Sequence, residues 1–403
     1  MQKPRLLVLL NRLSVGGPAT DLLSVLTALS NDFTILLVAG NSMADEQSAD
    51  FLLEKYKGFE TKKIHYLYRS VIPVNDVKAY YQIKQIIQEF KPDIVHTHGA
   101  KPGVLGRWAA YKLNVPVILH TFHGHVFHSY FSNFLSQKIV WLERKLAKIS
   151  SAVIAINEKL KNELADIYSI APVHKIKLIR IGVETEKFID ADAAKRNSFR
   201  NEFLLGEQTV AVGIAGRLVP VKNHRFFIEV AEKVISRSKG RQLKFFIIGD
   251  GSEKAELIKR LTLNNFSYTH AGDLYNPSAS FVFTSWRKDM ENVYAGLDIV
   301  LLTSLNEGTP VSVMEAMASS KTVVSTNAGG IAELIENGKT GFICTDPDQM
   351  ANTVLKLIES PELRDQIGSK AVSFALLHLS KEAEVAELRQ FYLELTGHTN
   401  RYQ

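Results

Sequence analysis

Residues 209–237 read TVAVGIAGRLVPVKNHRFFIEVAEKVISR and contain, in order, a candidate strand, a polar loop and a candidate helix. The apolar run Thr209–Ile214 is rich in β-branched residues, which is typical of a strand buried on both faces of a parallel sheet. Arg217 and Lys222 lie in the glycine-containing loop that follows, and a helical pattern then covers His224–Arg237. A strand that leads directly into a helix predicts a right-handed βαβ unit.

The same alternation extends in both directions along nearly the whole chain. Upstream, the predicted strands are Arg5–Leu10, Thr34–Val38, Ile94–His96, Val117–His120, Ala152–Ile156 and Ile176–Ile179. The helical patterns between them are Ala19–Leu29, Asp76–Phe90, Val104–Leu113, Ser132–Lys148 and Glu158–Tyr168. Downstream, the predicted strands are Lys244–Ile248, Phe281–Phe283, Ile299–Leu302, Thr322–Ser325 and Gly341–Ile343. The helical patterns there are Ser252–Leu261, Val311–Ser319, Gln349–Ile358 and Lys381–Leu395.

This pattern predicts an α/β protein with two doubly wound, Rossmann-like domains and an active site in the cleft between them. The length agrees, because 403 residues make two or three domains at about 150 residues each. A polar, charge-rich stretch at 183–203 separates the two series of strands. We therefore expect one domain at 1–185 and a second at 186–378, followed by a final segment at 379–403.

Composition excludes several classes of protein. Hydrophobic residues make up 46% of the chain and charged residues 22%, so disordered and fibrous classes are excluded. The apolar runs Leu6–Leu10 and Ile299–Leu302 are far shorter than the ~20 residues of a membrane span, and no secretory signal is expected. The single cysteine, Cys344, excludes an internal disulfide and favours a cytoplasmic location. A formal net charge of +6 without basic runs gives no reason to expect nucleic acid as a partner.

Glycines follow three of the predicted strands, where a loop can bring backbone N–H groups close to a phosphate. They are Gly16 and Gly17, then Gly216, and then Gly249 and Gly251 on either side of Asp250. In the second loop, Arg217 can grip two phosphate oxygens and Lys222 can act as a point charge, which suits a pyrophosphate. Tight turns and a solvated basic loop would explain the same residues. Neither a GxGxxG dinucleotide fingerprint nor a P-loop is present.

Two glutamates, eight residues apart, lie on either side of a predicted helix start. Glu307 belongs to the loop NEGTP at 306–310, and Glu315 lies about one and a half turns inside the helix. Glu315 can accept hydrogen bonds from a diol such as ribose, Glu307 can reach a sugar, and the helix N-terminus faces phosphates between them. The alternative is a pair of solvated glutamates. The apolar neighbours of Glu315 argue against that, because an ionised group there needs a partner.

Four histidines follow the strand at Val117–His120: His120, His123, His125 and His128. Their spacing permits a zinc site, although the helical HExxH pattern is missing. A core or capping role and a hydrogen bond to a sugar hydroxyl are the other interpretations.

Two carboxylate pairs have the DxD form that metal-dependent sugar transferases use: Asp190 with Asp192, and Asp346 with Asp348. Neither pair directly ends a clear strand. We interpret both as loop carboxylates and expect no metal ion and no cofactor.

Together, these pieces resemble the retaining glycosyltransferase family 4, whose members have the GT-B fold. The matching stretches, in the family's order, are the Gly16-Gly17 loop, VHTHGAKPGVLGRWAA at 95–110, HTFHGHVFHSYF at 120–131, GIAGRLVPVKN at 213–223, IIGDGSEKAEL at 247–257, NEGTPVSVMEAMA at 306–318 and NAGGIAELIENGKTGFI at 327–343. Residues 285–311 look most like bacterial enzymes that build surface polysaccharides or lipid-linked glycans. Two departures are a long polar segment at 263–280 and Ser319-Ser320, where the family usually has a glycine.

The resemblance implies a nucleotide-sugar donor, for which we expect UDP, and a catalytic set of His123, Arg217, Lys222 and Glu307. Arg217 and Lys222 hold the pyrophosphate, Glu307 the donor sugar, and His123 contacts that sugar from the first domain. Retention without an obvious nucleophile suggests front-side displacement. Physically, catalysis then rests on stabilising the departing diphosphate.

The remaining donor contacts are expected at Gly16, Gly17, Gly216, Asp250, Gly251, Arg287, Gly308, Thr309, Pro310 and Glu315. Within this set, Glu315 binds the ribose hydroxyls and the segment around Arg287 meets the base through its backbone. The GT-B resemblance also implies that the last helix, within 379–403, crosses back to the first domain. A related sugar-nucleotide epimerase and a catalytically inactive membrane-surface scaffold are the alternatives.

The acceptor implied by the resemblance is a glycan or a lipid-linked glycan, and one helical pattern fits a membrane surface. Its apolar stripe is Leu135, Ile139, Leu142, Leu146 and Ile149, and the basic residues off the stripe are Lys138, Arg144, Lys145 and Lys148. Such a helix can lie on the anionic inner face of a membrane. The alternative is a helix that packs its stripe on its own sheet.

Overall fold

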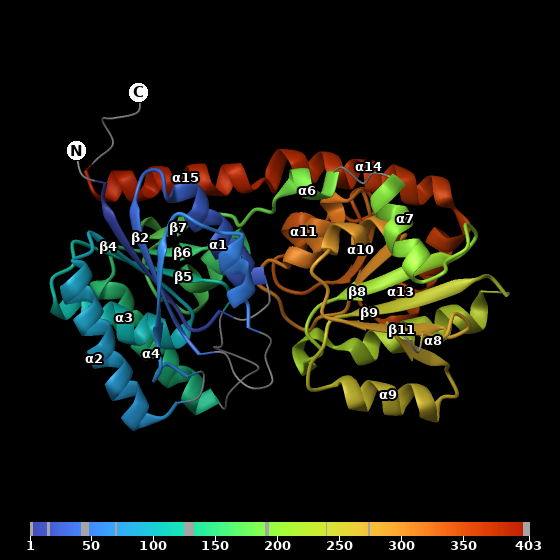
Figure 1. Cartoon of the computed structure of the whole chain (residues 1–403), viewed down its shortest axis with the longest axis horizontal. Coiled ribbons are helices and arrows are strands. Elements are labelled where there is room, and N and C mark those ends of the chain that lie inside the picture. Colours follow the sequence, from blue (N-terminus) through green and yellow to red (C-terminus); the bar gives the residue numbers. More distant parts are fainter. Residues whose placement is uncertain are drawn as a thin grey trace. The chain divides into compact units, whose positions relative to one another are not determined.

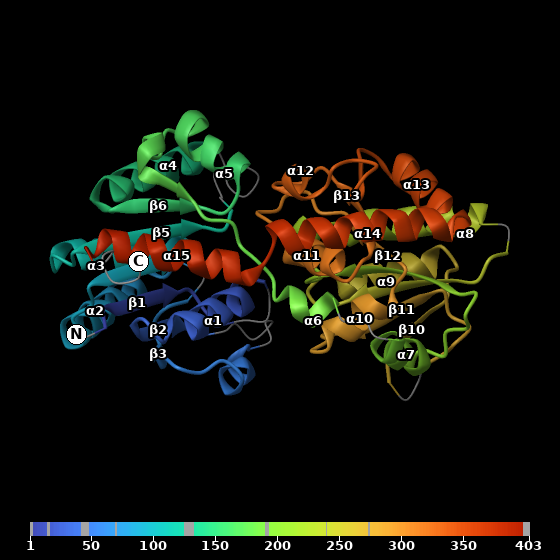
Figure 2. The same cartoon turned by 90° about the horizontal axis from the view of Figure 1, so that it is seen from above.

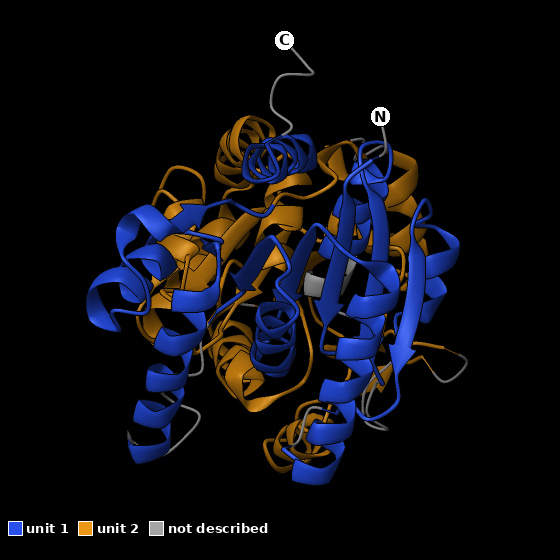
Figure 3. Cartoon of the chain, turned by 90° about the vertical axis from the view of Figure 1, so that its left-hand side faces the viewer, with its two compact units in different colours: residues 1–181, 381–403 blue, residues 182–380 orange. Residues whose placement is uncertain are grey.

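The computed structural model describes residues 3–13, 17–41, 48–68, 71–124, 133–189, 193–238, 240–272 and 275–397. The chain divides into two compact units, Met1–Ile181 with Lys381–Gln403 as unit 1 and Gly182–Ser380 as unit 2 (Figure 3). Each unit is built on one seven-stranded sheet, and all the strand pairs are parallel among the described residues. The prediction of two doubly wound parallel sheets is therefore confirmed.

The sheet of unit 1 has the strand order β3-β2-β1-β4-β5-β6-β7. Its strands are β1 Arg5–Leu10, β2 Thr34–Gly40, β3 Glu60–Ile64, β4 Ile94–His98, β5 Val117–Phe122, β6 Ala152–Ala155 and β7 Ile176–Leu178. We did not predict β3. Its sequence, ETKKI, exposes four of its five residues because β3 is an edge strand, so it has no apolar run to reveal it.

Helices cover both faces of this sheet (Figure 1). They are α1 Gly17–Leu29, α2 Pro73–Phe90, α3 Ala100–Lys112, α4 Asn133–Ile149, α5 Glu158–Asn162 and α15 Lys381–Leu395, with short 3-10 or π turns at Asp50–Glu54, Glu163–Ile167 and Val173–Lys175. Successive residues of β1 enter opposite cores, Leu6 and Val8 on the side of α1, Leu7 and Leu9 on the side of α2.

The last helix, α15, belongs to unit 1 and packs beside α1 (Figure 2). Tyr392 is buried, its ring meets Phe33 edge-on at 5.5 Å between centroids, and its hydroxyl lies 2.6 Å from Nδ1 of His96. Helix α15 is therefore part of the unit 1 core, although almost 200 residues of unit 2 separate it in sequence from the rest of that unit.

The sheet of unit 2 has the order β10-β11-β9-β8-β12-β13-β14. Its strands are β8 Val210–Ala215, β9 Leu243–Ile248, β10 Tyr268–His270, β11 Phe281–Ser285, β12 Ile299–Leu302, β13 Thr322–Thr326 and β14 Phe342–Cys344. The unpredicted strand is again at an edge. It is β10, and it lies inside the long polar segment 263–280 that departs from the family pattern.

The helices of unit 2 are α6 Thr185–Ile189, α7 Ala193–Glu202, α8 His224–Arg237, α9 Lys254–Leu263, α10 Met290–Gly296, α11 Val311–Ala318, α12 Ile331–Leu334, α13 Pro347–Glu359 and α14 Pro361–His378, with a 3-10 turn at Pro220–Lys222. Helices α6 and α7 lie in the stretch that polarity marked as the boundary between domains. Arg200 of α7 is buried, where it pairs with Asp298 at 3.3 Å and donates to three backbone carbonyls. Its charge is thus part of the packed unit, which composition could not reveal.

Candidate active site

The predicted phosphate-binding loops meet where the strand order of unit 2 reverses. Strand β8 has β9 on one side and β12 on the other, so the loops that leave β8 and β12 diverge around a crevice. These are the loops that carry Arg217 with Lys222 and Ser304 with Glu307. Ligands of open parallel sheets bind at such a position.

Lys222 and Glu307 form an ion pair across this crevice. The distance from Nζ of Lys222 to Oε1 of Glu307 is 2.6 Å, and the Ser304 hydroxyl donates to the same oxygen at 2.6 Å. The hydroxyl of Thr303 donates to the Lys222 carbonyl at 3.2 Å and holds the turn in place. Two residues that sequence analysis placed in the catalytic set are therefore in direct contact. Ser304, which we did not predict, fixes the carboxylate.

Glycine is required where the loops after β8 and β9 cross. Gly249 has φ 133°, and a Cβ atom there would lie 2.1 Å from the carbonyl oxygen of Gly216. The N–H of Gly216 donates to the Ile248 carbonyl at 2.9 Å. Along the first of these loops, the aliphatic stem of Lys222 packs over Gly216. The two glycines thus let the loops approach and leave room for the lysine.

Asp250 ties neighbouring loops together. Its Oδ1 accepts the N–H of Gly251 at 2.8 Å, and its Oδ2 accepts from Lys254 and from the Ser285 hydroxyl, both at 2.9 Å. Burial would raise the pKa of Asp250, but these donors outweigh it and hold the pKa below its ordinary value. We expected Asp250 to contact the nucleotide-sugar donor. In the structure its carboxylate has protein partners and orders the turn at Gly251.

Arg287 is likewise held by carboxylates of its own unit. Its guanidinium contacts Glu202 at 2.5 and 2.8 Å and Asp289 at 2.9 and 2.8 Å. The hydrogen bonds that Arg287 donates to Glu202 raise the pKa of its guanidinium further, so the group stays charged. The side chain is committed to these contacts, which leaves the backbone of this segment for the expected contact with a base.

The loop that bears Glu307 rests on a second pair of glycines. Gly329 has φ 59°, and a Cβ atom there would lie 1.8 Å from the Glu307 carbonyl oxygen. The N–H of Gly330 donates to the Gly308 carbonyl at 2.9 Å. Thr309 and Pro310 follow, and α11 begins directly after Pro310. This glycine stretch is part of the family pattern at 327–343. The sequence did not reveal that it supports the Glu307 loop.

Glu315 lies in a partly buried position on α11. Burial raises its pKa to about 7, and the adjacent buried Tyr294 hydroxyl and the charge of Lys187 partly offset that rise. Near neutral pH the carboxyl group therefore exchanges between a protonated and an ionised form. The second form is the better acceptor for a ribose diol.

In unit 1, histidines of β4 and the β5 end form a hydrogen-bonded cluster. His98 Nδ1 and His123 Nε2 are 2.9 Å apart, and His120 Nδ1 lies 2.8 Å from the Thr97 hydroxyl. Burial lowers the pKa of all three imidazoles, so they are neutral at pH 7. His120 is thus a core histidine, whereas His123 has a buried partner, His98, that sequence analysis missed.

A cavity of about 30 Å³ lies beside this cluster. Its polar lining consists of Asp21, His96, His98, Thr121, His123 and Glu384, all from unit 1. Nε2 of His98 is buried and has no hydrogen-bond partner among the described residues. Lys381 separates the two carboxylates, since it pairs with Asp21 and contacts Glu384 at 2.6 Å.

Two further predicted residues lie within the described ranges, and five do not. Gly17 is the first residue of α1, and Arg217 lies partly buried in the loop after β8. Gly16, His125, His128, Asp190 and Asp192 lie outside the described residues.

The second DxD pair has structural partners. The Asp346 side chain caps α13 by accepting the N–H of Gln349 at 2.9 Å, and Asp348 pairs with Lys233 and Arg237. Within the described ranges, no group of three or more His, Cys, Asp or Glu side chains could hold a metal ion.

Two family models match the chain. One, described as "Glycosyl transferases group 1", matches residues 209–360, and one described as "Glycosyltransferase Family 4" matches residues 15–187. The chain belongs to glycosyltransferase family 4. The resemblance drawn from its motifs is therefore confirmed.

Relatives of this family 4 glycosyltransferase agree. It is 29% identical, over 300 residues and 74% of each chain, to the UDP-Gal:α-D-GlcNAc-diphosphoundecaprenol α-1,3-galactosyltransferase of Escherichia coli. It is 26% identical to the capsular polysaccharide biosynthesis glycosyltransferase CapM of Staphylococcus aureus over 312 residues, 74% of this chain and 76% of CapM.

Solved structures show the same fold. HepE of Anabaena, in complex with UDP and glucose, matches with a TM-score of 0.77 at 20% identity, over 96% of this chain and 98% of HepE. A glycosyltransferase from Rickettsia africae matches with a TM-score of 0.78 at 21% identity, over 98% and 99% of the two chains. The fold of the chain is accordingly GT-B.

Proposed function

We propose that this family 4 glycosyltransferase moves a sugar from a UDP-sugar to a glycan or lipid-linked acceptor, with retention of configuration and without a metal ion. The observation that carries the proposal is the Lys222–Glu307 ion pair at the strand-order reversal of unit 2, next to the glycine loops at Gly216 and Gly249. The name of the Escherichia coli relative supports both a UDP-sugar donor and a diphospholipid-linked acceptor.

The proposed chemistry places positive charge where negative charge develops. When the bond between the anomeric carbon and the diphosphate breaks, its electron pair passes to the phosphate oxygen. Lys222 and Arg217 donate to that oxygen and its neighbours, which stabilises the transition state more than the bound substrate. The same cations make a metal ion unnecessary.

Retention is proposed to follow from attack on the face that the diphosphate leaves. The acceptor hydroxyl oxygen bonds to the anomeric carbon, and its proton passes to the departing phosphate oxygen. Glu307 is a poor nucleophile for the alternative double displacement, because Oε1 already accepts from Lys222 and Ser304 at 2.6 Å each. We assign it the donor-sugar hydroxyls instead.

A lipid-linked acceptor would bring the reaction to the inner face of the membrane, where the protein would bind peripherally.

The test is a transfer assay with UDP-galactose, UDP-glucose and UDP-N-acetylglucosamine and a short-chain polyprenyl-diphosphate-linked sugar. We expect product with an α-linkage by NMR, unchanged by EDTA. Loss of activity on chelation, with rescue by manganese, would contradict metal independence. Formation of an isomerised UDP-sugar in the absence of acceptor would indicate the epimerase. No turnover with any donor would indicate the inactive scaffold.

A further inference from the structure

The apolar stripe that the sequence predicted for membrane contact faces largely inward. Leu146 of α4 is 2% exposed, and Ile139, Leu142 and Ile149 are partly buried. Four of the five stripe residues are therefore at least partly buried within unit 1. Leu135 is the exposed member of the stripe. A membrane contact through this stripe is therefore not supported.

An adjacent face of α4 exposes a different stripe. Phe134, Lys138, Trp141 and Lys145 follow one another at spacings of four, three and four residues, which is one helix face. Phe134 is 68% and Trp141 55% exposed. Nζ of Lys138 lies 4.3 Å from the Phe134 ring centroid, and Nζ of Lys145 lies 3.8 Å from that of Trp141. Aromatic rings and lysine charges therefore alternate on this face.

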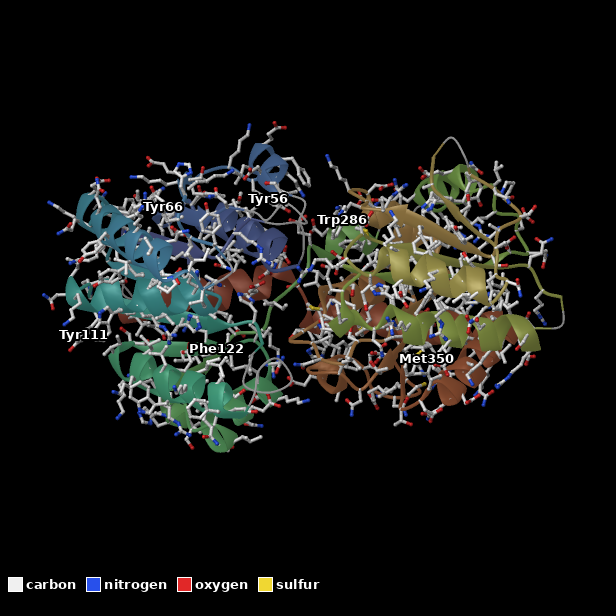
Figure 4. All side chains as sticks on the ribbon, turned by 90° about the horizontal axis from the view of Figure 1, so that it is seen from below. Tyr56, Tyr66, Tyr111, Phe122, Trp286 and Met350 are labelled. Atoms are coloured by element: carbon white, nitrogen blue, oxygen red, sulfur yellow. The ribbon has the colours of Figure 1, made fainter. Side chains whose placement is uncertain are left out.

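Helix α3 lies between α2 and α4 (Figure 4), and both α2 and α3 also expose large apolar side chains. Val74, Val77 and Tyr81 lie at spacings of three and four along α2, and Tyr81 is 63% exposed. On α3, Trp108 is 44% exposed and Nζ of Lys112 lies 5.2 Å from its ring centroid. We call these exposed stripes of α2, α3 and α4 the outer face.

Two ion pairs fix how α2, α3 and α4 are shifted along their axes relative to one another. They are Asp76–Lys101 at 2.5 Å, between α2 and α3, and Arg107–Glu143 at 2.6 Å, between α3 and α4. The helices run in the same direction because each connects parallel strands. When positions along the helix axes are counted in residues from these ion pairs, Tyr81, Trp108 and Trp141 differ by about one helical turn at most, or ~5 Å. The three aromatics therefore form one row across the outer face.

The positive charge of the chain is concentrated in the segment that includes α3 and α4. Residues 94–157 contain seven Lys and Arg and a single carboxylate, Glu143. This excess of positive charge equals the formal net charge of the whole chain, +6. The positive and negative charges of all the other residues therefore cancel. Glu143 is buried against Arg107 and does not face solvent. Helices α3 and α4 therefore carry no exposed carboxylate, and on α2 the charges of Asp76 and Glu89 are balanced by Lys78 and Lys84.

We propose that the outer face docks on an anionic lipid bilayer and holds unit 1 against it. Aromatic rings prefer the polar–apolar boundary of a bilayer, and lysines beside them reach the phosphates while their stems stay apolar. Each lysine near an anionic surface contributes about a five-fold gain in binding. The inference rests on the proposed function in one respect, because a lipid-linked acceptor gives the docking its purpose.

The first test is flotation with phosphatidylcholine vesicles, with and without phosphatidylglycerol. We expect the protein to bind when phosphatidylglycerol is present, less strongly as salt increases. Lys138→Gln/Lys145→Gln should reduce binding roughly thirty-fold. The control Lys259→Gln/Lys339→Gln removes two exposed lysines of unit 2 and should bind as the wild type does. No binding by the wild type, or equal loss in both variants, would overturn the proposal.

A second test uses the three tryptophans of the chain, Trp108, Trp141 and Trp286. In Trp108→Phe/Trp286→Phe, the remaining Trp141 should shift its emission to the blue on anionic vesicles. In Trp108→Phe/Trp141→Phe, Trp286 of unit 2 reports a region outside the outer face and should not shift. A shift of Trp286 without a shift of Trp141 would contradict docking through the outer face.

The two proposals can fail separately. With a water-soluble acceptor, Lys138→Gln/Lys145→Gln should transfer sugar as the wild type does, because no lysine of the outer face belongs to the proposed donor site. With the same acceptor linked to lipid in anionic vesicles, transfer should fall in parallel with vesicle binding. Inactivity of the wild type on both the soluble and the lipid-linked acceptor would contradict the proposed function, whereas equal rates of both proteins on vesicles would contradict the docking.

Discussion

At the carboxyl edge of its sheet, unit 1 carries neutral imidazoles, whereas unit 2 carries paired charges. The imidazoles of His96, His98 and His120 project from strand residues, and burial lowers the pKa of each. Lys222 and Glu307 project from loops beyond the strands, where they keep partial contact with solvent. A strand end in a doubly wound sheet therefore favours uncharged donors and acceptors, and the loop beyond it can hold charge.

The comparison also separates two chemical tasks. In the proposed reaction, stabilising the departing diphosphate needs fixed positive charge, which Lys222 and Arg217 of unit 2 would supply. Orienting sugar hydroxyls needs donors and acceptors that keep one tautomer without a charge, which the imidazoles of unit 1 can supply. Changes at the two edges should therefore have effects of different size and kind.

The largest effect is expected for Lys222→Ala. In the proposed reaction, Lys222 stabilises charge that develops in the transition state, so we expect kcat to fall about 10²–10³-fold, with a smaller change in the donor KM. Steady-state kinetics measure both. Lys233→Ala removes another ion-paired lysine of unit 2, on α8, and should keep the wild-type kcat. An increase in KM with kcat unchanged would show that Lys222 contributes to donor binding alone.

A smaller effect is expected at the neutral edge. His98→Asn should lower kcat by at most about 10²-fold, because His98 acts by orienting the His123 ring through the 2.9 Å contact. If the two rings act as a unit, His98→Asn/His123→Ala should be no slower than His123→Ala. A further loss in the double variant would mean that His98 acts independently. Isothermal titration with UDP should give equal affinities for the three variants.

Glu315 should couple donor binding to pH. Its pKa of about 7 means that the carboxyl group ionises between pH 6 and 8, and the ionised form is the better acceptor of ribose hydrogen bonds. The donor KM should therefore fall roughly five-fold over this interval. Glu315→Gln should show a high KM that does not change with pH. A parallel pH profile in the variant would assign the titration to another group.

Protein stability should change with pH in the opposite direction. Because folding raises the pKa of Glu315 above its ordinary value of 4.5, the folded state binds this proton more tightly than the unfolded state. The contribution is complete below about pH 4.5 and is lost as pH rises through 7. Allowing for partial exposure, we expect a loss of roughly 1–2 kcal/mol in wild type relative to Glu315→Gln. Urea unfolding of both proteins at pH 5 and pH 8 measures it.

The smallest effect is expected at the turn after α11. Ser320 has φ 58°, a left-handed conformation that glycine adopts without cost, and it stands where the family usually has glycine. Ser320→Gly should increase the free energy of unfolding by about 0.5–1 kcal/mol. The neighbouring Ser319 is buried at φ −86°, so Ser319→Gly should decrease it. Urea unfolding gives both values, and equal signs would contradict the conformational explanation.

Much of the donor side could be predicted because its residues are close together in sequence. Gly216, Arg217 and Lys222 lie within one strand-to-helix connection, so a local pattern identifies them. Ser304 and Glu307 lie within another. Contacts between these connections could not be predicted. The Lys222–Glu307 pair spans 85 residues, and the pair of His98 and His123 spans 25 residues across two neighbouring strands.

The sequence by itself determined the two parallel sheets, the order of most strands and helices, and the family. Local periodicity and glycine positions carry this information, because strands buried on both faces have continuous apolar runs. The tertiary structure alone decided which charges are paired and which faces are exposed. On α4, only Leu146 of the periodic leucines and isoleucines proved to be fully buried, and the aromatic–lysine stripe proved to be exposed. The physical reason is that burial and pairing depend on neighbours brought together by folding, which periodicity in one segment cannot specify.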